Sequence, residues 1–341
     1  MYQKFRERYI LNVLKSTDKF NYNVLSYHEK ITWSIIQQNA DKSWDWDGIS
    51  RHKNITWDII KDNPEKPWKW NYISLNPNIT WKVIEDHRDK PWNWYYISEH
   101  PNITWQIIND NPDKPWNWQA MSKNKNITWD IIRDNPEKPW NWYYISENLN
   151  ITSKIIQNNP GISWDWRGIS HNTNITWEII KDNLDKEWHW YGISYNPNIT
   201  WEIIQDNLDK PWDWYFLSKK KNITWDIIFD NLDCPWNWQA VSHNPNITWE
   251  IIKNNSDKPW DWLAISANPN ITWAIITNNL DKQWNWQNIS DNSNIFKLPE
   301  RVFREHFAAK KIYKYWFRCI TDPSYAICRK RLMREFKQII S

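Results

Sequence analysis

The residues that could carry catalytic chemistry in this chain are few, and they lack the spacing of known sites. The eight His follow no metal-ligand spacing, and Cys234, Cys319 and Cys328 form no C-x-x-C motif. A phosphate-binding loop, a nucleophile elbow and an H-E-x-x-H zinc motif are also missing from the sequence. We therefore expect no catalytic residue, no cofactor and no metal site, and a protein that is not an enzyme.

Residues that could bind a partner occur at two variable positions beside a recurring W-x-W motif. The residue directly after each W-x-W varies, and so does the residue four positions further on; at helical spacing the two share one face. We expect the residue directly after the first variable position, Gly168 or Phe216 for example, to match in size the space into which it packs. The candidate partner-binding residues are Tyr95 and Glu99, Tyr143 and Glu147, Arg167 and His171, Tyr191 and Tyr195, Tyr215 and Lys219, and Gln239 and His243.

These motifs follow a period of 24 residues that has no insertion or deletion. The W-x-W motif occurs eleven times, and a Ser follows four positions after each. A degenerate earlier repeat has aromatic residues and Ser26 at the matching positions. Such a period predicts identical structural units stacked as a solenoid. The markers run from Trp44 and Trp46 to Trp284 and Trp286, from Ser50 to Ser290, and, for the Trp of the I-T-W motif, from Trp33 to Trp273 with a break at Ser153.

Each repeat is typical of two short helices. In the repeat 127–150, Thr128 suits the N-cap of a first helix. Asn135 and Pro136 suit its end, since Asn tolerates the left-handed conformation and Pro cannot continue a helix. A second helix is expected to begin at residues 137–139 and to end near Asn148. The sequence thus predicts an all-α fold, an α-solenoid of about eleven to twelve helix-pair repeats with a C-terminal helical hairpin.

The alternative is a β-solenoid or a coil of the leucine-rich type, because I-T-W and W-x-W could alternate as strands. The scarcity of Leu and the positions of the caps and Pro favour helix pairs. The repeat 151–174 departs most from the pattern, with Ser153 in place of Trp. We expect it to be the least stable repeat in the middle of the array, whether it is a functional bend or sequence drift.

Three segments follow from the period: a degenerate N-terminal capping repeat at 1–30, the Trp-rich repeats at 31–296 and a basic C-terminal helical cap at 297–341. Residues 31–296 contain 25 Lys and Arg against 33 Asp and Glu, whereas residues 297–341 contain 12 against 4. We expect one elongated domain, an acidic rod with basic ends. The basic tail residues singled out are Arg329, Lys330, Arg331, Arg334 and Lys337.

The motifs N-P-N-I-T-W-E-I-I and D-K-P-W-N-W-Y-Y-I-S resemble Trp-rich tandem repeats in uncharacterised proteins of giant DNA viruses of the mimivirus type. The segment Ala308–Phe336 is similar to a C-terminal segment that recurs on such proteins. The resemblance covers nearly the whole chain. It implies a viral origin, with expression in a host cytoplasm or packaging in a virion, and it supplies no catalytic residue.

The leading hypothesis is a non-enzymatic scaffold for protein–protein interactions, which binds a host or viral protein through the variable helix-face positions. Alternatives are a structural virion or assembly protein, joined end to end, and binding of nucleic acid or an acidic partner through the basic tail alone. No signal peptide or membrane-spanning stretch is visible, so we expect a cytoplasmic monomer that is not secreted and has no membrane partner.

Overall fold

The computed structural model describes residues 2–297, 318, 325–327 and 330, and this part of the chain contains 24 helices and no strand. The predicted all-α fold is confirmed, and the β-solenoid alternative is wrong for the described residues. The predicted C-terminal hairpin and the tail residues Arg329, Arg331, Arg334 and Lys337 lie outside the described residues. Lys330 is described and exposed.

Two compact units make up the chain: residues 1–10 with 296–341, and residues 11–295. The smaller unit contains the first part of α1 (Tyr2–Lys15) and a few described residues near the C-terminus, among them the exposed Ile327. The larger unit contains all the repeats. It is the subject of the description that follows.

Eleven repeats of the larger unit are pairs of short helices, as expected, and in the degenerate first repeat the short helix α2 follows the longer α1. The first helices are α3 (Trp33–Gln37), α5 (Trp57–Asp62), α7 (Trp81–Asp86), α9 (Trp105–Asp110), α11 (Trp129–Asp134), α13 (Ser153–Asn158), α15 (Trp177–Asp182), α17 (Trp201–Gln205), α19 (Trp225–Asp230), α21 (Trp249–Asn254) and α23 (Trp273–Thr277). The second helices are α2 (Tyr22–Leu25), α4 (Trp46–Ser50), α6 (Trp70–Ile73), α8 (Trp94–Glu99), α10 (Trp118–Met121), α12 (Trp142–Glu147), α14 (Trp166–His171), α16 (Trp190–Tyr195), α18 (Trp214–Ser218), α20 (Trp238–His243), α22 (Trp262–Ala267) and α24 (Trp286–Asp291).

The first helix of each repeat begins at the predicted cap but ends by a different mechanism. Thr128 caps α11 by accepting the N–H of Ile131, and the same Thr cap forms in nine of the eleven complete repeats. Asn135 does not adopt the expected left-handed conformation, since its φ is −133°. Instead its Nδ2–H donates to the carbonyl of Ile131 at 2.8 Å, and its own carbonyl accepts the indole N–H of Trp140 at 2.9 Å.

The second helix begins later than predicted, at Trp142 rather than at residues 137–139. Pro139 disfavours a helical conformation at the residue before it, and the N–H of Trp140 bonds to the carbonyl of Lys138 in a tight turn. Asn141 is then extended, and its side chain caps α12 by accepting the N–H of Tyr144 at 3.2 Å. The W-x-W motif therefore straddles the start of the helix.

A buried Ser at the end of each second helix joins successive repeats; we call these residues the repeat serines. The hydroxyl of Ser122 donates to the carbonyl of Trp118 at 2.8 Å and accepts the N–H of Asn141, in the next repeat, at 2.9 Å. The forward bond occurs between all consecutive repeats, at 2.8–3.0 Å. The repeat serines are Ser26, Ser50, Ser74, Ser98, Ser122, Ser146, Ser170, Ser194, Ser218, Ser242, Ser266 and Ser290.

A second buried side chain, two residues further on, bonds back to the preceding repeat; we call these the ladder residues. The Nδ2–H group of Asn124 donates to carbonyls of Ser98, His100 and Ile103 at 3.0–3.2 Å. The carbonyl of His100 also accepts the N–H of Ile103, and that of Ile103 also accepts the side-chain amide of Asn126, so the ladder residue adds further hydrogen bonds between successive repeats. The ladder residues are His28, His52, Asn76, His100, Asn124, Asn148, Asn172, Asn196, Lys220, Asn244, Asn268 and Asn292.

Aromatic rings fill the space between neighbouring repeats. The ring of Trp116 lies 5.7 Å from that of Trp81 and 5.2 Å, edge to face, from that of Trp94, both in the preceding repeat. In the repeat 151–174 the first of these partners is replaced by Ser153, and Trp188 keeps its contact with Trp166 at 5.0 Å. The missing ring contact supports the prediction that this repeat is the least stable in the middle of the array.

The same three contacts also join the last repeat to the first. The N–H of Asn21 donates to the repeat serine Ser290 at 2.9 Å, and Nε2 of His28 lies 3.1 Å from the carbonyl of Asn292. Phe20 takes the place of the core Trp, with its ring 5.6 Å from Trp273 and 6.0 Å from Trp286. We call this junction between α2 and α24 the seam.

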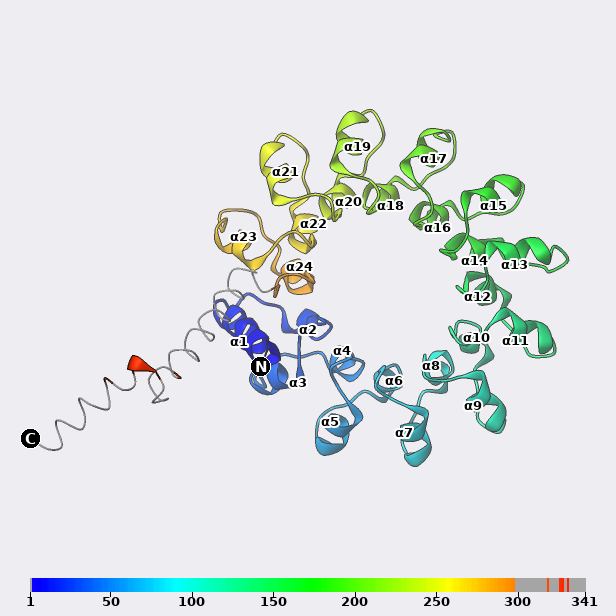
Figure 1. The fold of residues 1–341 in the computed structure, drawn as a ribbon, viewed down its shortest axis with the longest axis horizontal. Coiled ribbons are helices and arrows are strands. Elements are labelled where there is room, and N and C mark those ends of the chain that lie inside the picture. The colour runs from blue at the N-terminus through cyan, green and yellow to red at the C-terminus, as the bar shows by residue number, and fades with distance from the viewer. Residues whose placement is uncertain (1, 298–317, 319–324, 328–329, 331–341) are drawn as a thin grey trace, which may run out of the picture. The chain divides into compact units, whose positions relative to one another are not determined.

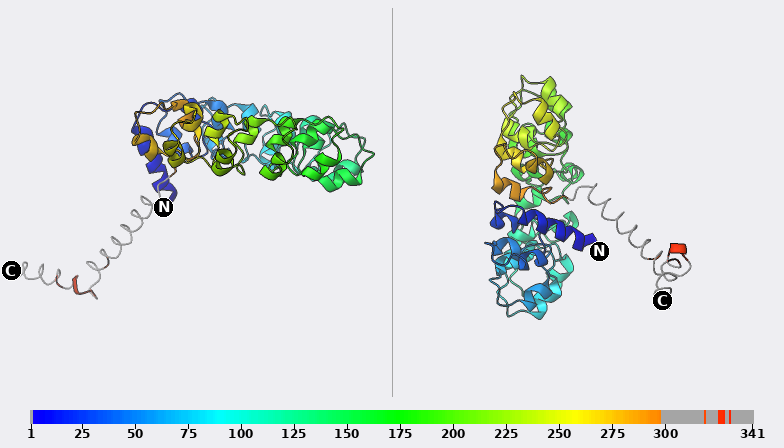
Figure 2. Two further views of the ribbon diagram at one scale, coloured as in Figure 1. Left: turned by 90° about the horizontal axis from the view of Figure 1, so that it is seen from above. Right: turned by 90° about the vertical axis from the view of Figure 1, so that its left-hand side faces the viewer.

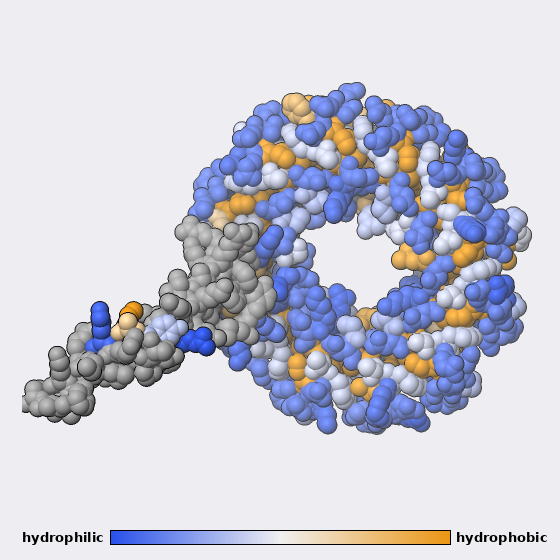
Figure 3. Space-filling view, viewed as in Figure 1, coloured by the Kyte–Doolittle hydropathy of each residue, from blue (hydrophilic) through white to orange (hydrophobic). Residues whose placement is uncertain are grey.

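Residues 11–295 therefore form a closed ring with twelve second helices (Figure 1). The expected elongated rod is wrong for this unit. The second helices form the inner layer of the ring and the first helices the outer layer. Seen edge-on, the ring is a narrow band (Figure 2), and the space-filling view shows an open centre with apolar residues between the two layers (Figure 3).

Closure of the ring predicts the exchange rate of one amide. In an open array the N–H of Asn21 would have no serine partner, whereas in the ring Ser290 protects it. We expect Ser290→Ala to speed hydrogen exchange at the Asn21 amide at least about tenfold, because exchange then needs no opening of that bond. Ser146→Ala, which removes the matching bond to Asp165, is the control. An Asn21 amide that exchanges freely in the wild-type chain would show that the ring is open.

Close packing between α12 and α14 predicts the effect of a single methyl group. A Cβ on Gly168 would lie 2.3 Å from the carbonyl oxygen of Tyr143, a distance that forces the helices apart. We expect Gly168→Ala to lower the free energy of unfolding by about 1–3 kcal/mol in urea titrations. Gly161→Ala is the matched control, since a Cβ there has no heavy atom within 4 Å. Equal unfolding midpoints for the two variants would contradict this packing.

Candidate functional site on the inner layer

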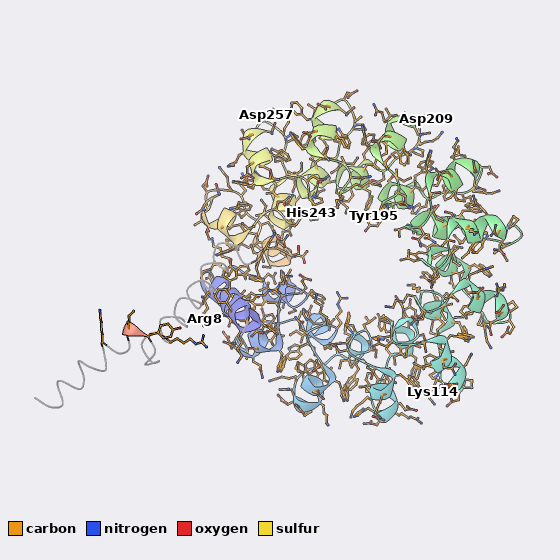
Figure 4. The ribbon with its side chains drawn as sticks, in the orientation of Figure 1. Arg8, Lys114, Tyr195, Asp209, His243 and Asp257 are labelled. Carbon is orange, nitrogen blue, oxygen red and sulfur yellow. The ribbon has the colours of Figure 1, made fainter. Side chains whose placement is uncertain are left out.

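The twelve predicted partner-binding residues all lie on or directly after second helices, in the inner layer of the ring. Tyr195, on α16, and His243, on α20, lie toward the open centre, whereas Asp209 and Asp257 lie at the outer edge (Figure 4). These two residues of the predicted stripe therefore lie on the side of the open centre. Whether these residues bind a partner stays a prediction.

An aromatic cluster joins part of this stripe across neighbouring repeats. The ring of Tyr191 lies 6.0 Å from that of His171 and 4.3 Å from that of Phe216. Phe216 also contacts Tyr195 at 5.9 Å and Tyr215 at 5.1 Å. The expectation that this position serves packing alone is thus incomplete, because Phe216 is the centre of the cluster.

Tyr143 also reaches this cluster, since its ring lies 6.4 Å from that of His171 and 5.1 Å from that of Tyr144. Tyr95 belongs to a neighbouring group, in which the ammonium of Lys123 lies 3.3 Å from the Tyr95 hydroxyl and 4.1 Å from the centre of the Tyr144 ring. Glu99 and Glu147 line a cavity beside that group. Arg167 pairs with Glu187 at 3.6 Å.

A groove of about 850 Å³ opens beside the aromatic cluster; we call it the basic groove. Tyr195, Phe216, Lys219 and His243 line it, and most of its lining is apolar. The turns after five consecutive second helices contribute the rest, through Thr173, Pro197, Lys221, Pro245 and Pro269 and their neighbours Lys220 and Asn222. No Asp or Glu is among the lining residues.

Two Lys of the basic groove have no carboxylate partner among the described residues. Lys219 is half-buried, with its ammonium 4.8 Å and 4.9 Å from the ring centres of Tyr215 and Phe216, and Lys221 is exposed. By contrast, Lys210 at the outer edge pairs with Asp209 at 2.8 Å. The groove is therefore a cationic site on an array that is acidic as a whole.

The third Lys, Lys220, is a ladder residue rather than a free cation. Its side chain is buried, and its ammonium donates to the carbonyls of Ser194 at 3.2 Å and Asn196 at 2.5 Å. Burial lowers the pKa of Lys220 to about 7. The sequence contained a signal for this site, since Lys219–Lys221 interrupts a run of repeats with Asn at the ladder position.

Equivalent cavities occur in other repeats, with different charges. A cavity of about 360 Å³ is lined by Glu99, Lys123 and Glu147 at the matching positions, and one of about 180 Å³ by Tyr27 and Arg51. The inner layer thus has cavities at equivalent positions of several repeats. Its side chains differ from place to place, so different arcs of the ring can recognise different groups.

The described residues contain no group of three or more His, Cys, Asp or Glu placed to hold a metal ion. None of their helices combines the length and the apolar character that a membrane crossing requires.

The buried ammonium of Lys220 predicts a pH dependence. Between pH 7 and 10.5 the unfolded chain binds a proton at Lys220 that the folded chain does not, so this residue makes stability rise with pH over that range. We expect Lys220→Asn to remove this rise and to be more stable at pH 7 by on the order of 2–4 kcal/mol. Melting temperatures recorded from pH 7 to 10 measure this change of stability with pH. Lys221→Asn should leave the rise unchanged, and a rise that persists in Lys220→Asn would contradict the assignment.

In comparisons with known proteins, no protein-family model, no curated protein and no solved structure matches the chain. A proposal for function therefore depends on the ring, its inner layer and the basic groove.

Proposed function

We propose that this chain is a non-enzymatic scaffold for protein–protein interactions, which holds a partner polypeptide against the inner layer of the ring, mainly at the basic groove. The observation that carries the proposal is the cluster of exposed aromatic side chains in and beside this groove. Tyr191, Tyr195 and Tyr215 are 45%, 58% and 39% exposed. Aromatic side chains in such a position contribute disproportionately to protein interfaces, because they bury a large area with few rotatable bonds.

The scaffold around these residues is rigid, which favours binding. The repeat serines and ladder residues hold every second helix to its neighbours, so the variable side chains start from fixed positions. A surface that is ordered before binding loses less entropy when a partner docks. The fixed and variable positions of the repeat thus have separate roles, in structure and in recognition.

The inner layer as a whole does not suit a polyanion. Its two variable positions carry four Lys or Arg and four Asp or Glu around the ring, so a nucleic acid passing through the centre would meet both charges equally. These residues are Arg51, Lys123, Arg167 and Lys219, and Asp47, Glu99, Glu147 and Asp291. Nucleic-acid binding stays a proposal for the basic tail alone. End-to-end assembly through the array has no free end face to use, because the seam occupies both.

The resemblance to giant-virus repeat proteins makes an infected host cell the natural source of a partner. We expect the immobilised full chain to retain a polypeptide from such a lysate. The triple variant Tyr191→Ala, Tyr195→Ala, Tyr215→Ala should retain at least about tenfold less of it, since a central aromatic contact is worth more than 1 kcal/mol.

The matched control is the triple variant Leu184→Ala, Leu208→Ala, Leu232→Ala. These Leu are equally exposed, at 45–52%, but they follow the first helices, in the outer layer. We expect the control to retain the partner as the wild-type chain does. Equal losses in both variants, with both folded by circular dichroism, would rule out the inner layer as the binding surface.

A further inference from the structure

We propose that the basic groove binds a short, extended, acidic segment of the partner polypeptide, with one large apolar side chain against Tyr195 and Phe216 and carboxylates at Lys219 and Lys221. This inference rests on the proposed function and names the chemistry of the partner.

The charges of the groove select an anionic partner. Lys219 and Lys221 have no carboxylate partner among the described residues, and no acidic side chain lines the groove. Lys220, between them, already donates to two carbonyls and is not available. Two ammonium groups therefore remain for a ligand, and a carboxylate that meets one at a half-buried site such as Lys219 forms a charge-assisted hydrogen bond.

The apolar part of the groove requires more than a negative charge. Tyr195 is 58% exposed beside Phe216, and both rings belong to the lining together with Pro197 and Pro245. Water in contact with these surfaces is displaced favourably by an apolar side chain. The ammonium of Lys219 lies over the Phe216 ring, so the apolar and anionic contacts are adjacent.

The form of the groove suits an extended chain. Its lining includes the turns after five consecutive second helices, from Thr173 to Pro269, so it runs along the ring rather than into it. An extended polypeptide advances about 3.3 Å per residue and places alternate side chains on opposite sides. One side chain can then lie on the aromatic rings while its neighbours reach the two Lys.

Polypeptide is favoured over nucleic acid by the small number of free cations. A nucleic acid carries a charge on every nucleotide and binds through many Lys and Arg contacts. The groove offers two, and acidic residues lie on either side of it along the inner layer, at Glu147 and Asp291. A short segment with a few carboxylates matches this arrangement, whereas a longer polyanion would be repelled beyond the groove.

Three fluorescein-labelled probes test the inference by fluorescence anisotropy with the full chain. The first is a short peptide of Glu residues with one central Trp, the second has Gln in place of Glu, and the third has Ala in place of Trp. We expect the first to bind at least about tenfold more tightly than the other two, and more weakly as salt is raised. A single-stranded oligothymidylate of equal charge should bind more weakly than the first peptide.

Charge-reversal variants test where the peptide binds. The double variant Lys219→Glu, Lys221→Glu should bind the first peptide at least about tenfold more weakly than the wild-type chain. The control Lys181→Glu, Lys253→Glu, on outer helices α15 and α21, has the same net charge and should bind the first peptide as the wild-type chain does. Equal losses in both pairs, tighter binding of the oligonucleotide, or no binding of the first peptide would overturn the inference. The lysate experiment separates this inference from the proposed function. If the triple variant Tyr191→Ala, Tyr195→Ala, Tyr215→Ala loses the lysate partner but the peptide tests fail, the inner layer still binds a partner and only the acidic character of that partner is wrong.

Discussion

The repeat serine is the constraint on which the rest of the ring depends. Its hydroxyl accepts a backbone N–H from the next repeat and, in nine of the twelve, also donates backward to a carbonyl of its own helix, so both of its hydrogen-bonding roles are then used in a buried position. A side chain this short fixes the distance between the end of one second helix and the start of the next. An inserted residue between W-x-W and Ser would move the hydroxyl out of reach and leave a buried N–H without an acceptor, which is costly. The unbroken period follows from this requirement.

Closure changes how such an array resists unfolding. In an open solenoid the terminal repeats contact one neighbour and fray first. Here every repeat from α2 to α24 has a neighbour on both sides, and the seam uses a serine bond, a ladder bond and an aromatic contact like those elsewhere. The seam nevertheless differs from an ordinary junction, because it joins residues far apart in the sequence and Phe20 there replaces the larger Trp. The repeat 151–174, which lacks one aromatic contact, is the other weak point.

Structural features that depend on residues close together in the sequence were predictable, whereas features that depend on the stacking of many repeats were not. The period, the Thr cap and the helix pair are local, so they were predictable from residues such as Thr128 and Asn135. Closure was not, because it depends on a small rotation between repeats, set by how rings such as Trp116 and Trp94 pack. The predicted stripe was placed correctly on the second helices. Phe216 and Lys221 were missed as groove residues, because they approach Tyr195 and His243 only when successive repeats are stacked.

A closed ring also restricts how this chain can change over generations. Open solenoids gain or lose whole repeats by duplication and deletion, since an added copy only lengthens the stack. Twelve equal steps around a circle turn by about 30° each, and thirteen would need about 28°. A duplication would thus have to be matched by a slight change of packing at every junction, or it would leave the ends overlapping. The copy number is fixed by geometry, and the variable side chains of the inner layer are where such a chain is free to diversify.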